Sequence, residues 1–462
     1  NKTVIMKTFF TKSALYLALT IPAFFFLGCD DSEEGGSYEF SVEPTVLTFS
    51  AKQETQTLSV RTYGDWSIVL PQDAAWLKVS AMSGRGPAEI EVTAENYYRT
   101  DTSRTARLTV TGGNSGDFPV EVVQQKLQMN DLSAAGKANC YIVPTSGDFA
   151  IDAATQGNSE SEQVGEWTSA ELLWEDNREL ITDLYGDPES KRIFFSTAAA
   201  GNAVIAVKDA SGKILWSWHI WATDFDPNAK TLKYTNDNGS TWEFMDRNLG
   251  AANAESGSFG AFGLLYQWGR KDPFAPENPS ETIRWNMLNN PLPAMASDAD
   301  SMGTVQLSIE HPTSFYVTRY AHGDWNGQPD PNLWGAVSGQ KTVYDPCPAG
   351  WRVPAYDAQG DSPYAFVTRQ TTTGTDNIGR IYTDGNGNDF LFPVAGSRVN
   401  GTGTLDCPGN YGSLWTATGK TTSNEDGTIE YGCLLFFTTG RLVSATYYNT
   451  RSQGVSVRCV KE

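Results

Sequence analysis

Apolar and polar residues alternate in four short segments of the first third of the chain. These segments are residues 57–61, 89–93, 106–110 and 119–123. Such alternation is typical of strands with one buried face, because successive side chains of a strand point to opposite sides of the sheet. Glycine-rich turns at 83–87 and 111–114 separate the segments. The pattern predicts a β-sandwich of roughly seven or eight strands, of immunoglobulin type, over residues 38–126.

Two apolar runs further along the chain predict a hairpin. Residues 202–208 and 214–221 flank a short turn rich in small and polar residues. By the two-residue period of a strand, Trp216 lies on one face of this hairpin and His219 on the other. We expect His219 to be half exposed on the outer face; complete burial is the alternative. The hairpin predicts a second β-sandwich module over residues 127–228.

The first residues of the chain have a different pattern. A basic stretch with Lys7 and Lys12 precedes an apolar run at 14–27, which ends in the tripeptide Leu-Gly-Cys29. This run is too short to span a bilayer core of about 30 Å, and the pattern is typical of a secretory signal. The tripeptide resembles the bacterial lipobox, whose cysteine is lipidated. We therefore predict that residues 1–28 are a lipoprotein signal peptide and that Cys29 is the lipidation site.

The residues after Cys29 are strongly acidic. Asp30, Asp31, Glu33 and Glu34 lie within the segment 29–37. The segment is similar to the acidic tag that directs lipoproteins of Bacteroidetes to the outer face of the outer membrane. A solvated acidic linker is the alternative. We expect a protein that contacts the outer membrane only through its lipid anchor and faces the cell exterior.

Composition narrows the classes of function. The chain has 54 acidic and 34 basic residues, a net charge of −20, which makes nucleic acid an improbable partner. With only three histidines, a multi-histidine metal site is poorly supplied. The sequence has no P-loop, G-x-S-x-G or H-E-x-x-H motif. We expect no catalytic residues, no metal site and no cofactor.

The first module resembles a known family. Trp66 and Trp76, a glycine-rich turn, the run beginning at Arg104 and the closing segment 122–125 occur in the order of the BACON domain. The resemblance implies either carbohydrate binding or a spacer that holds a distal domain away from the membrane. The two tryptophans could bind sugar, but packing between the sheets is the favoured interpretation.

Residues 229–462 resemble a second family. Four motifs, at 242–250, 265–270, 345–354 and 456–459, occur in the order of the Fibrobacter major paralogous domain, a relative of the C-type-lectin-like fold. The resemblance implies short helices beside small twisted sheets, with the first and last strands together. The expected fold is therefore mainly β, with two immunoglobulin-like β-sandwich modules followed by an α+β C-type-lectin-like domain. Residues 260–268 are expected to form one of the short helices.

Five cysteines remain after Cys29, so at least one should be unpaired. The terminal strand pairing that the resemblance implies favours a disulfide between Cys347 and Cys459. Cys407 and Cys433 are additional to the family's usual pair and are expected to form a second disulfide, which leaves Cys140 free.

The calcium-dependent sugar motifs of true C-type lectins are absent from the sequence. The segment 384–389 offers oxygen atoms at alternating positions but lacks the glycine and the glutamate of an EF-hand loop. We expect a hairpin turn there; a calcium site is the alternative.

An aromatic segment between residues 314 and 334 is the candidate glycan site. Its aromatic, carboxylate and amide side chains could stack on a sugar ring and bind its hydroxyl groups. The candidate residues are Tyr316, His322, Asp324, Trp325, Asn326 and Trp334. The alternative is a loop that packs on its own side chains. An open aromatic groove here would favour glycan binding.

These features predict a non-enzymatic surface lipoprotein that presents a lectin-like domain for glycan binding or adhesion. Its partner would be a glycan or a surface protein. The alternative is a structural or tip subunit of a fimbria-like assembly, which exposed, unpaired strand edges in the middle module would favour. A glycan hydrolase is a third possibility, because it needs only two well-placed carboxylates.

Overall fold

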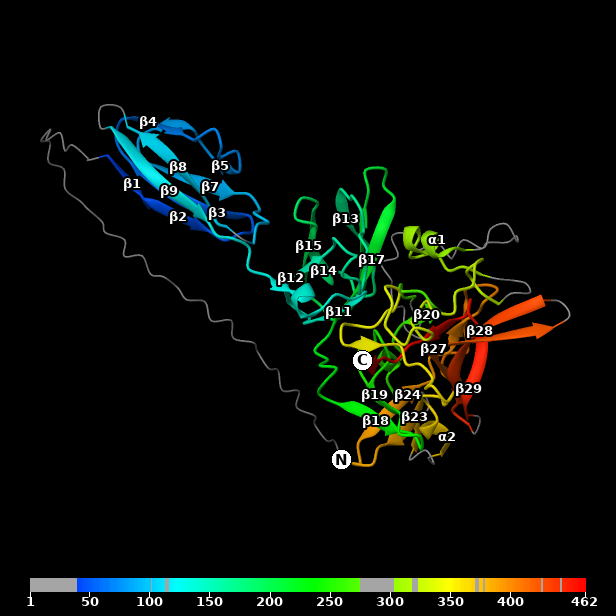
Figure 1. Ribbon diagram of the computed structural model, residues 1–462. Helices are drawn as coiled ribbons and strands as arrows, with labels where there is room; N and C mark the ends of the chain where they lie inside the picture. Colours follow the sequence, from blue (N-terminus) through cyan, green and yellow to red (C-terminus); the bar gives the residue numbers. More distant parts are fainter. Residues whose placement is uncertain are drawn as a thin grey trace, which may run out of the picture. The chain divides into compact units, whose positions relative to one another are not determined.

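The structure is a computed structural model in which nearly all regular elements are strands (Figure 1). It describes residues 40–100, 102–112, 116–274, 303–317, 323–369, 374–376, 379–424, 427–440 and 443–462. In these ranges the α-helices are the short α1 (Val305–Glu310) and α2 (Phe366–Arg369). The prediction of a mainly β protein is therefore confirmed. The predicted signal segment and Cys29 lie outside the described residues.

The chain forms two compact units. Unit 1 contains the described residues of 40–49, 54–95 and 105–123, and unit 2 contains those of 50–53, 96–104 and 124–462. No helix in the described ranges is long and apolar enough to cross a membrane.

Unit 1 is a sandwich of two sheets, as the alternation predicted. One sheet has the order β1 (Ser41–Glu43), β3 (Glu54–Arg61), β7 (Ala88–Ala94), β5 (Leu77–Val79). The other has the order β2 (Val46–Phe49), β9 (Asp117–Gln124), β8 (Arg104–Thr111), β4 (Asp65–Val69), β6 (Ser83–Arg85). The indole of Trp66 is buried in the core and donates to the carbonyl of Gly86 at 3.0 Å. Trp66 is therefore a core residue, and Trp76 packs half-buried against the same core.

The middle strands form a second pair of sheets within unit 2. The first has the order β10 (Asn130–Asp131), β12 (Gly147–Asp152), β15 (Arg192–Thr197), β14 (Ile181–Asp187). The second has the order β11 (Cys140–Val143), β17 (Ile214–Ala222), β16 (Gly201–Lys208), β13 (Ser169–Glu175). The predicted hairpin is β16 and β17, which pair antiparallel. Trp216, Trp218 and Ile220 of β17 pack toward the first sheet.

The opposite face of this second sheet is also buried, which the sequence did not predict. Trp221 and Val204 share a hydrophobic cluster with Leu264, Trp268 and other residues of the C-terminal part of the chain. His219, on the same face, is only 2% exposed, so the expectation of a half-exposed histidine is wrong. The physical reason is that a further layer of the protein covers this face.

Three more sheets complete unit 2. One has the order β18 (Thr231–Thr235), β19 (Thr241–Met245), β31 (Val460–Lys461), β21 (Trp351–Arg352). A larger sheet has the order β26 (Leu405–Asp406), β25 (Ser397–Arg398), β30 (Gly454–Ser456), β27 (Tyr411–Asn424), β28 (Gly427–Thr438), β29 (Val443–Thr450), and β20 (Leu265–Gln267) also pairs with β30. The third consists of β22 (Gly374–Asp376), β23 (Gly379–Thr383) and β24 (Asp389–Pro393). β31, the last strand, pairs with β19 and lies in the same sheet as β18, the first strand of this part of the chain.

Two local predictions have opposite outcomes. The helix expected at 260–268 is absent: a 3-10 turn, η3 (Phe259–Ala261), precedes β20. Gly263 adopts a φ of 71°, which ends the helical turn, and the next residues pair with β30 instead. The hairpin turn expected at 384–389 is present between β23 and β24, where Asp384 accepts bonds from the backbone N–H groups of Asn386 and Asn388, both at 2.8 Å.

One of the two expected disulfides is present. Cys347 and Cys459 are bonded, with their Cα atoms 6.0 Å apart. Cys407, Cys433 and Cys140 are free, so the expected pairing of Cys407 with Cys433 is wrong.

The strand register explains why this second pair does not form. Cys407 lies in the turn before β27, and that turn meets the end of β28, where Tyr411 pairs with Thr438. Cys433 lies five residues earlier along β28. At ~3.3 Å per residue this separation is about 16 Å, whereas disulfide-bonded Cα atoms lie within about 7 Å of each other.

Candidate functional site

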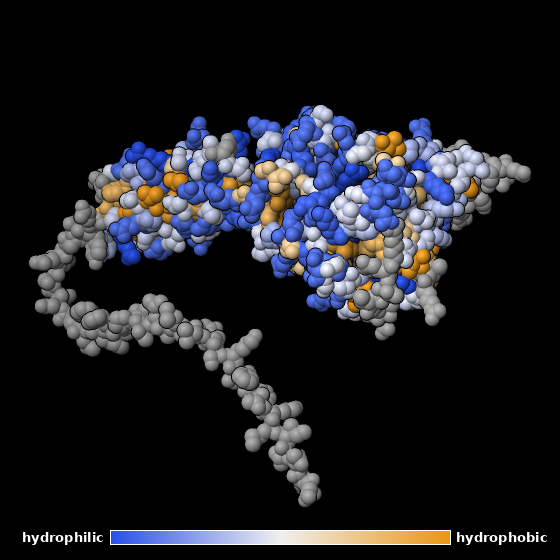
Figure 2. Space-filling model, turned by 60° about the horizontal axis from the view of Figure 1, so that its bottom comes forward, coloured by the Kyte–Doolittle hydropathy of each residue, from blue (hydrophilic) through white to orange (hydrophobic). Residues whose placement is uncertain are grey.

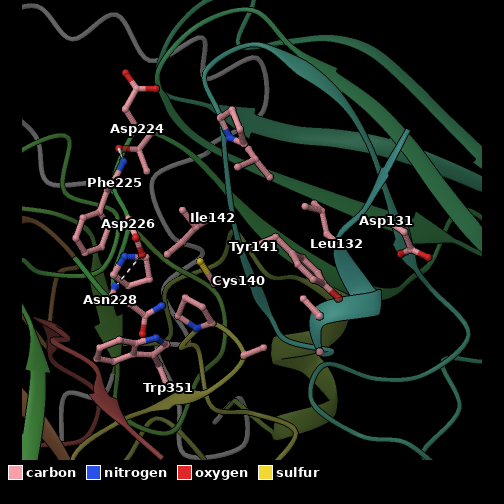
Figure 3. Close-up of a pocket in the computed structure, with 18 residues that line it drawn as sticks. Asp131, Leu132, Cys140, Tyr141, Ile142, Asp224, Phe225, Asp226, Asn228 and Trp351 are labelled. Atoms are coloured by element: carbon pink, nitrogen blue, oxygen red, sulfur yellow. Dashed lines mark hydrogen bonds between the residues drawn. The ribbon is translucent and has the colours of Figure 1, made fainter. Parts of the chain in front are cut away.

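A cleft of about 680 Å³ runs along strand β11 in unit 2 (Figure 3). We call it the β11 cleft. Its lining comes from three parts of unit 2, residues 131–144, 223–228 and 348–351. Figure 3 shows Phe225, Asp226 and Asn228 on one side and Leu132 and Tyr141 on the other, with Ile142 between them.

β11 is an edge strand, because it pairs only with β17 in its sheet. The two strands are parallel, and Asn139 and Val143 accept backbone bonds from His219 and Thr223, each at 2.8 Å. In a parallel ladder the residues that bond to the neighbour alternate along the strand. The N–H and C=O groups of Cys140 and Ile142 therefore point away from β17.

These backbone groups border the cleft. The consecutive residues 140–144 all line the cleft. Only every second side chain of a strand points to one side, so the backbone of this segment must also face the cleft. None of the four groups of Cys140 and Ile142 has a hydrogen-bond partner in the part of the chain that the structure describes. Cys140 is 0% exposed and Ile142 is half-buried, so the accessible part of this unpaired edge lies at Ile142.

The apolar wall of the cleft is held in position by local contacts. The N–H of Phe225 donates to the Thr223 hydroxyl at 3.2 Å. Its ring lies 5.4 Å from the Trp221 ring and 4.0 Å from the Arg247 guanidinium carbon. Phe225 and Ile142 are only half-buried, so an apolar group entering the cleft could cover both.

The rim of the cleft is acidic. Asp224 and Asp226 are exposed, and Asp226 accepts the backbone N–H of Asn228 at 2.9 Å. Asp131 pairs with Arg192 at 2.8 Å. The carboxylate of Asp224 has no hydrogen bond or ion pair within the described ranges. Because two of these carboxylates have no cation beside them, the cleft attracts positive charge.

The described lining of the cleft has no activated thiol. Burial raises the pKa of the Cys140 thiol well above its usual range, so no thiolate nucleophile is available at neutral pH. No group of three or more histidine, cysteine or acidic residues suited to a metal ion occurs among the residues that the structure describes. The cleft offers apolar contacts, backbone hydrogen bonds and negative charge.

A second cavity, of about 300 Å³, contains an unusual carboxyl group. Burial raises the pKa of Asp176 to about 6, and Asn202 donates to this carboxylate from its backbone at 2.6 Å and from its side chain at 2.7 Å. No other acidic residue lines this cavity among the described residues. It therefore lacks the two carboxylates that glycoside hydrolysis needs.

The candidate glycan residues are in the interior instead of at the surface. Tyr316 is 9% exposed, and Asp324, Trp325, Asn326 and Trp334 are all at 3% or less. His322 lies outside the described residues. The buried rings have no free face for a sugar, so the glycan platform predicted for these residues is wrong, and the packed-loop alternative holds.

Polar groups of this segment are satisfied inside the protein. The indole N–H of Trp325 donates to the carbonyl of Trp268 at 2.7 Å. Asp324 forms an ion pair with Arg451 at 3.0 Å, and the Arg451 guanidinium lies 4.3 Å from the Trp268 ring. The aromatic and carboxylate side chains that suggested a ligand are therefore partners of one another.

The residues of the β11 cleft were not predicted as a site. A sequence signal was present: residues 223–228 alternate acidic, aromatic and proline residues directly after a buried strand, where binding loops are common. Pro144 also ends a short apolar run, which is typical of an edge strand.

Comparisons with known proteins bear on part of the chain. Residues 66–125 match the BACON family, described as "Putative binding domain, N-terminal". No curated protein matches the chain.

Three solved structures illustrate the structural matches. A Bacteroides ovatus GH5 xyloglucanase in complex with a XXXG heptasaccharide matches with 24% identity and a TM-score of 0.18, over 23% of this chain. The chain spans 27% of that enzyme. A protein from Bacteroides thetaiotaomicron matches with 20% identity and a TM-score of 0.16, over 22% of this chain and 99% of its own. The E. coli chaperone DraB matches with 12% identity and a TM-score of 0.16, over 40% of this chain and 96% of its own. The family match, by contrast, confirms the BACON resemblance at residues 66–125.

Proposed function

We propose that the protein is a non-catalytic binding protein of the cell surface, in which the β11 cleft takes up an extended polypeptide segment of a partner. The observation that carries the proposal is the unpaired edge of β11, where the backbone groups of the half-buried Ile142 border the cleft without partners among the described residues. The BACON match supports a binding or surface-associated role for the chain.

Strand addition accounts for each part of the cleft. An added strand receives main-chain hydrogen bonds from a sheet edge, and adjacent pockets select its alternate side chains. In the β11 cleft, Phe225 and Ile142 would cover apolar side chains of the segment. Asp224 and Asp226 would bind lysine or arginine side chains, so the segment is expected to alternate apolar and basic residues.

Protein binding at a strand edge favours the alternative of a structural or tip subunit in a surface assembly. That interpretation required an unpaired strand edge among the middle strands, and β11 has one. A lectin-like role of the C-terminal part and a lipid anchor at Cys29 belong to the same proposal. Replacing Cys29 with alanine should abolish incorporation of a labelled fatty acid, and labelling of the variant would rule out this anchor.

The test of the cleft uses the full chain without residues 1–28 and a random displayed peptide library. Peptides selected on this protein are synthesised and titrated against Ile142→Pro and the matched Ile142→Val variant. Proline removes an N–H that does not bond to β17, so the ladder to β17 is kept. We expect at least tenfold weaker binding for Ile142→Pro and little change for Ile142→Val.

A second pair of variants keeps the test decisive if the proline variant is unstable. Asp224→Lys and Asp226→Lys reverse charge at exposed positions and should leave the fold unchanged. They should weaken the selected peptides at least tenfold, with the loss decreasing at high salt. Unchanged affinity in these variants, or a failure to select any peptide richer in lysine and arginine than the library, would rule out strand capture.

A further inference from the structure

A polar pocket of about 460 Å³ lies elsewhere in unit 2, between the segment 158–162 and the loop 330–344. Eight of its twelve lining residues are asparagine, glutamine, serine, threonine, aspartate or glutamate, and the others are Leu333, Lys341, Val343 and Tyr344. The lining residues used below are Asn158, Glu162, Asp330, Gln340, Lys341 and Tyr344. None of them lines the β11 cleft.

Asn158 has a buried oxygen atom without a partner. Its side-chain nitrogen donates to the carbonyl of Thr342 at 2.6 Å, which fixes the amide against the loop. Its Oδ1 atom is buried and has no hydrogen-bond partner in the described part of the chain. An unsatisfied buried acceptor costs free energy, and it belongs to a residue that lines the pocket.

The other polar side chains at the pocket include both hydrogen-bond acceptors and hydrogen-bond donors. Asp330 uses one carboxylate oxygen to accept the N–H of Asn332 at 2.7 Å, which leaves the second oxygen available. The side chains of Glu162 and Gln340 are exposed and form no hydrogen bond or ion pair within the described ranges. The half-buried Tyr344 brings an aromatic ring and a hydroxyl group to the same pocket.

The pocket has negative charge but no available cation. The ammonium group of Lys341 donates to the carbonyls of Cys347 at 3.0 Å and Pro348 at 2.7 Å, and pairs with Glu462 at 3.4 Å. Burial and the carboxylates of Glu162 and Asp330 raise the pKa of Tyr344, which is evidence that both acids act on its hydroxyl group. An anionic ligand would therefore be repelled.

We propose that this pocket binds a neutral saccharide. Hydroxyl groups on adjacent ring carbons both donate and accept, so they match a set of carboxylate, amide and phenol groups. The volume lies within the range of about 300 to 1,000 Å³ found for small-molecule sites. The Tyr344 ring supplies an apolar surface for the sugar ring. The side chains of the pocket would contact the saccharide themselves, without a bridging metal ion, since no metal-binding cluster occurs among the described residues.

The pocket requires residues from both predicted modules of unit 2. Asn158 and Glu162 come from the middle strands' region, whereas Asp330, Gln340 and Tyr344 come from the C-terminal part. A fragment that begins near residue 229 would lack Asn158, Ser159 and Glu162, three of the twelve lining residues. The experiment therefore uses the full chain without residues 1–28.

The probe is an array of defined neutral, sialylated and sulfated oligosaccharides. We expect binding to be confined to neutral structures. For the neutral oligosaccharide with the strongest signal, Glu162→Ala and Gln340→Ala should each weaken binding at least fivefold, because each removes one exposed hydrogen-bonding group. Glu255→Gln, which changes an exposed carboxylate outside the pocket, is the matched control and should bind as the parent does.

The outcomes separate this proposal from strand capture. Asp224→Lys should weaken peptides and leave the saccharide unaffected, while Glu162→Ala should do the reverse. Absence of any neutral oligosaccharide that binds, equal binding of sialylated structures, or unchanged affinity in both alanine variants would overturn the saccharide site without affecting the β11 cleft. Unchanged peptide affinity in Asp224→Lys would count only against the cleft.

Discussion

The segment 323–334 and the β11 cleft contain similar residue types but use them differently. In the segment, Trp325 and Trp334 are at most 1% exposed. In the cleft, Phe225 is half-buried and the neighbouring Asp224 is exposed. Both regions combine aromatic and carboxylate groups in irregular backbone. The difference shows that aromatic density in a loop does not identify a ligand surface.

The partners of the polar groups distinguish the two regions. In the segment, the two indole N–H groups donate to backbone carbonyls and Asp324 is paired with Arg451. In the cleft, the backbone groups of Ile142 and the carboxylate of Asp224 have no partners among the described residues. Groups already satisfied inside a protein stabilise the fold, whereas unsatisfied groups at an open edge are available to a ligand.

The largest expected effect is on the interior segment. Trp325→Ala removes a buried ring and its hydrogen bond to Trp268, so the free energy of unfolding should fall by about 3 to 5 kcal/mol. Chemical denaturation measures this loss. Trp325→Phe is the control and should lose less, because it keeps most of the packing. A change below about 1 kcal/mol for the alanine variant would mean that the segment is not a packed interior.

The next effect concerns the disulfide beside the cleft. Cys347 lies next to the cleft residues 348–351, and its bond to Cys459 closes a separation of 112 residues. Replacing both cysteines with alanine should lower the free energy of unfolding by about 2 to 4 kcal/mol. Peptide affinity should fall as well, because one wall of the cleft loses its anchor. Cys407→Ala changes an exposed free cysteine and should alter neither quantity.

The buried histidine predicts an acid-sensitive interior. Burial lowers the pKa of His219 to about 3, whereas an unfolded histidine titrates near 6.5. Because the pKa of His219 is lower in the folded than in the unfolded protein, protonation of the unfolded chain favours unfolding at acid pH. The contribution of the neutral imidazole to stability is therefore complete above pH 6.5 and is lost as the pH falls toward 3. The loss approaches about 1.4 kcal/mol per pH unit, or about 2 kcal/mol between pH 6.5 and 5.

The variant His219→Gln isolates this contribution, because glutamine can still donate toward Asn202, the hydrogen-bond partner of the imidazole. Asp176 acts in the opposite direction: burial raises its folded pKa to about 6, so its burial costs stability as the pH rises from about 4 to 6. This residue is present in parent and variant, so their difference reports the histidine. Parallel pH profiles of parent and His219→Gln would contradict the prediction.

The sequence predicted the features that depend on local pattern. The alternation in 57–61 and 106–110 predicted strands of unit 1, and the apolar runs around the 210–213 turn predicted the β16–β17 hairpin, because strand period and turn residues are local signals. Predictions that depended on distant partners failed. Asp324 meets Arg451 from 127 positions away, and His219 is covered by residues far along the chain. The periodicity of apolar residues within one strand or helix does not indicate which distant residues will come into contact.

Replacing Phe225 should change the free energy of unfolding less than the other variants do, but should weaken peptide binding strongly. The ring is half-buried, so Phe225→Ala removes part of its packing against Trp221 and its contact with Arg247. We expect the free energy of unfolding to fall by about 1 kcal/mol, within the range of one exposed cation–π contact and modest burial. The affinity for peptides selected on the β11 cleft should fall at least tenfold, since the wall that covers their apolar side chains is lost. Phe225→Leu, which restores apolar volume, should recover most of the binding. A loss of stability as large as that of Trp325→Ala, with peptide binding unchanged in the folded protein, would mean that Phe225 is an interior residue and that the two regions do not differ.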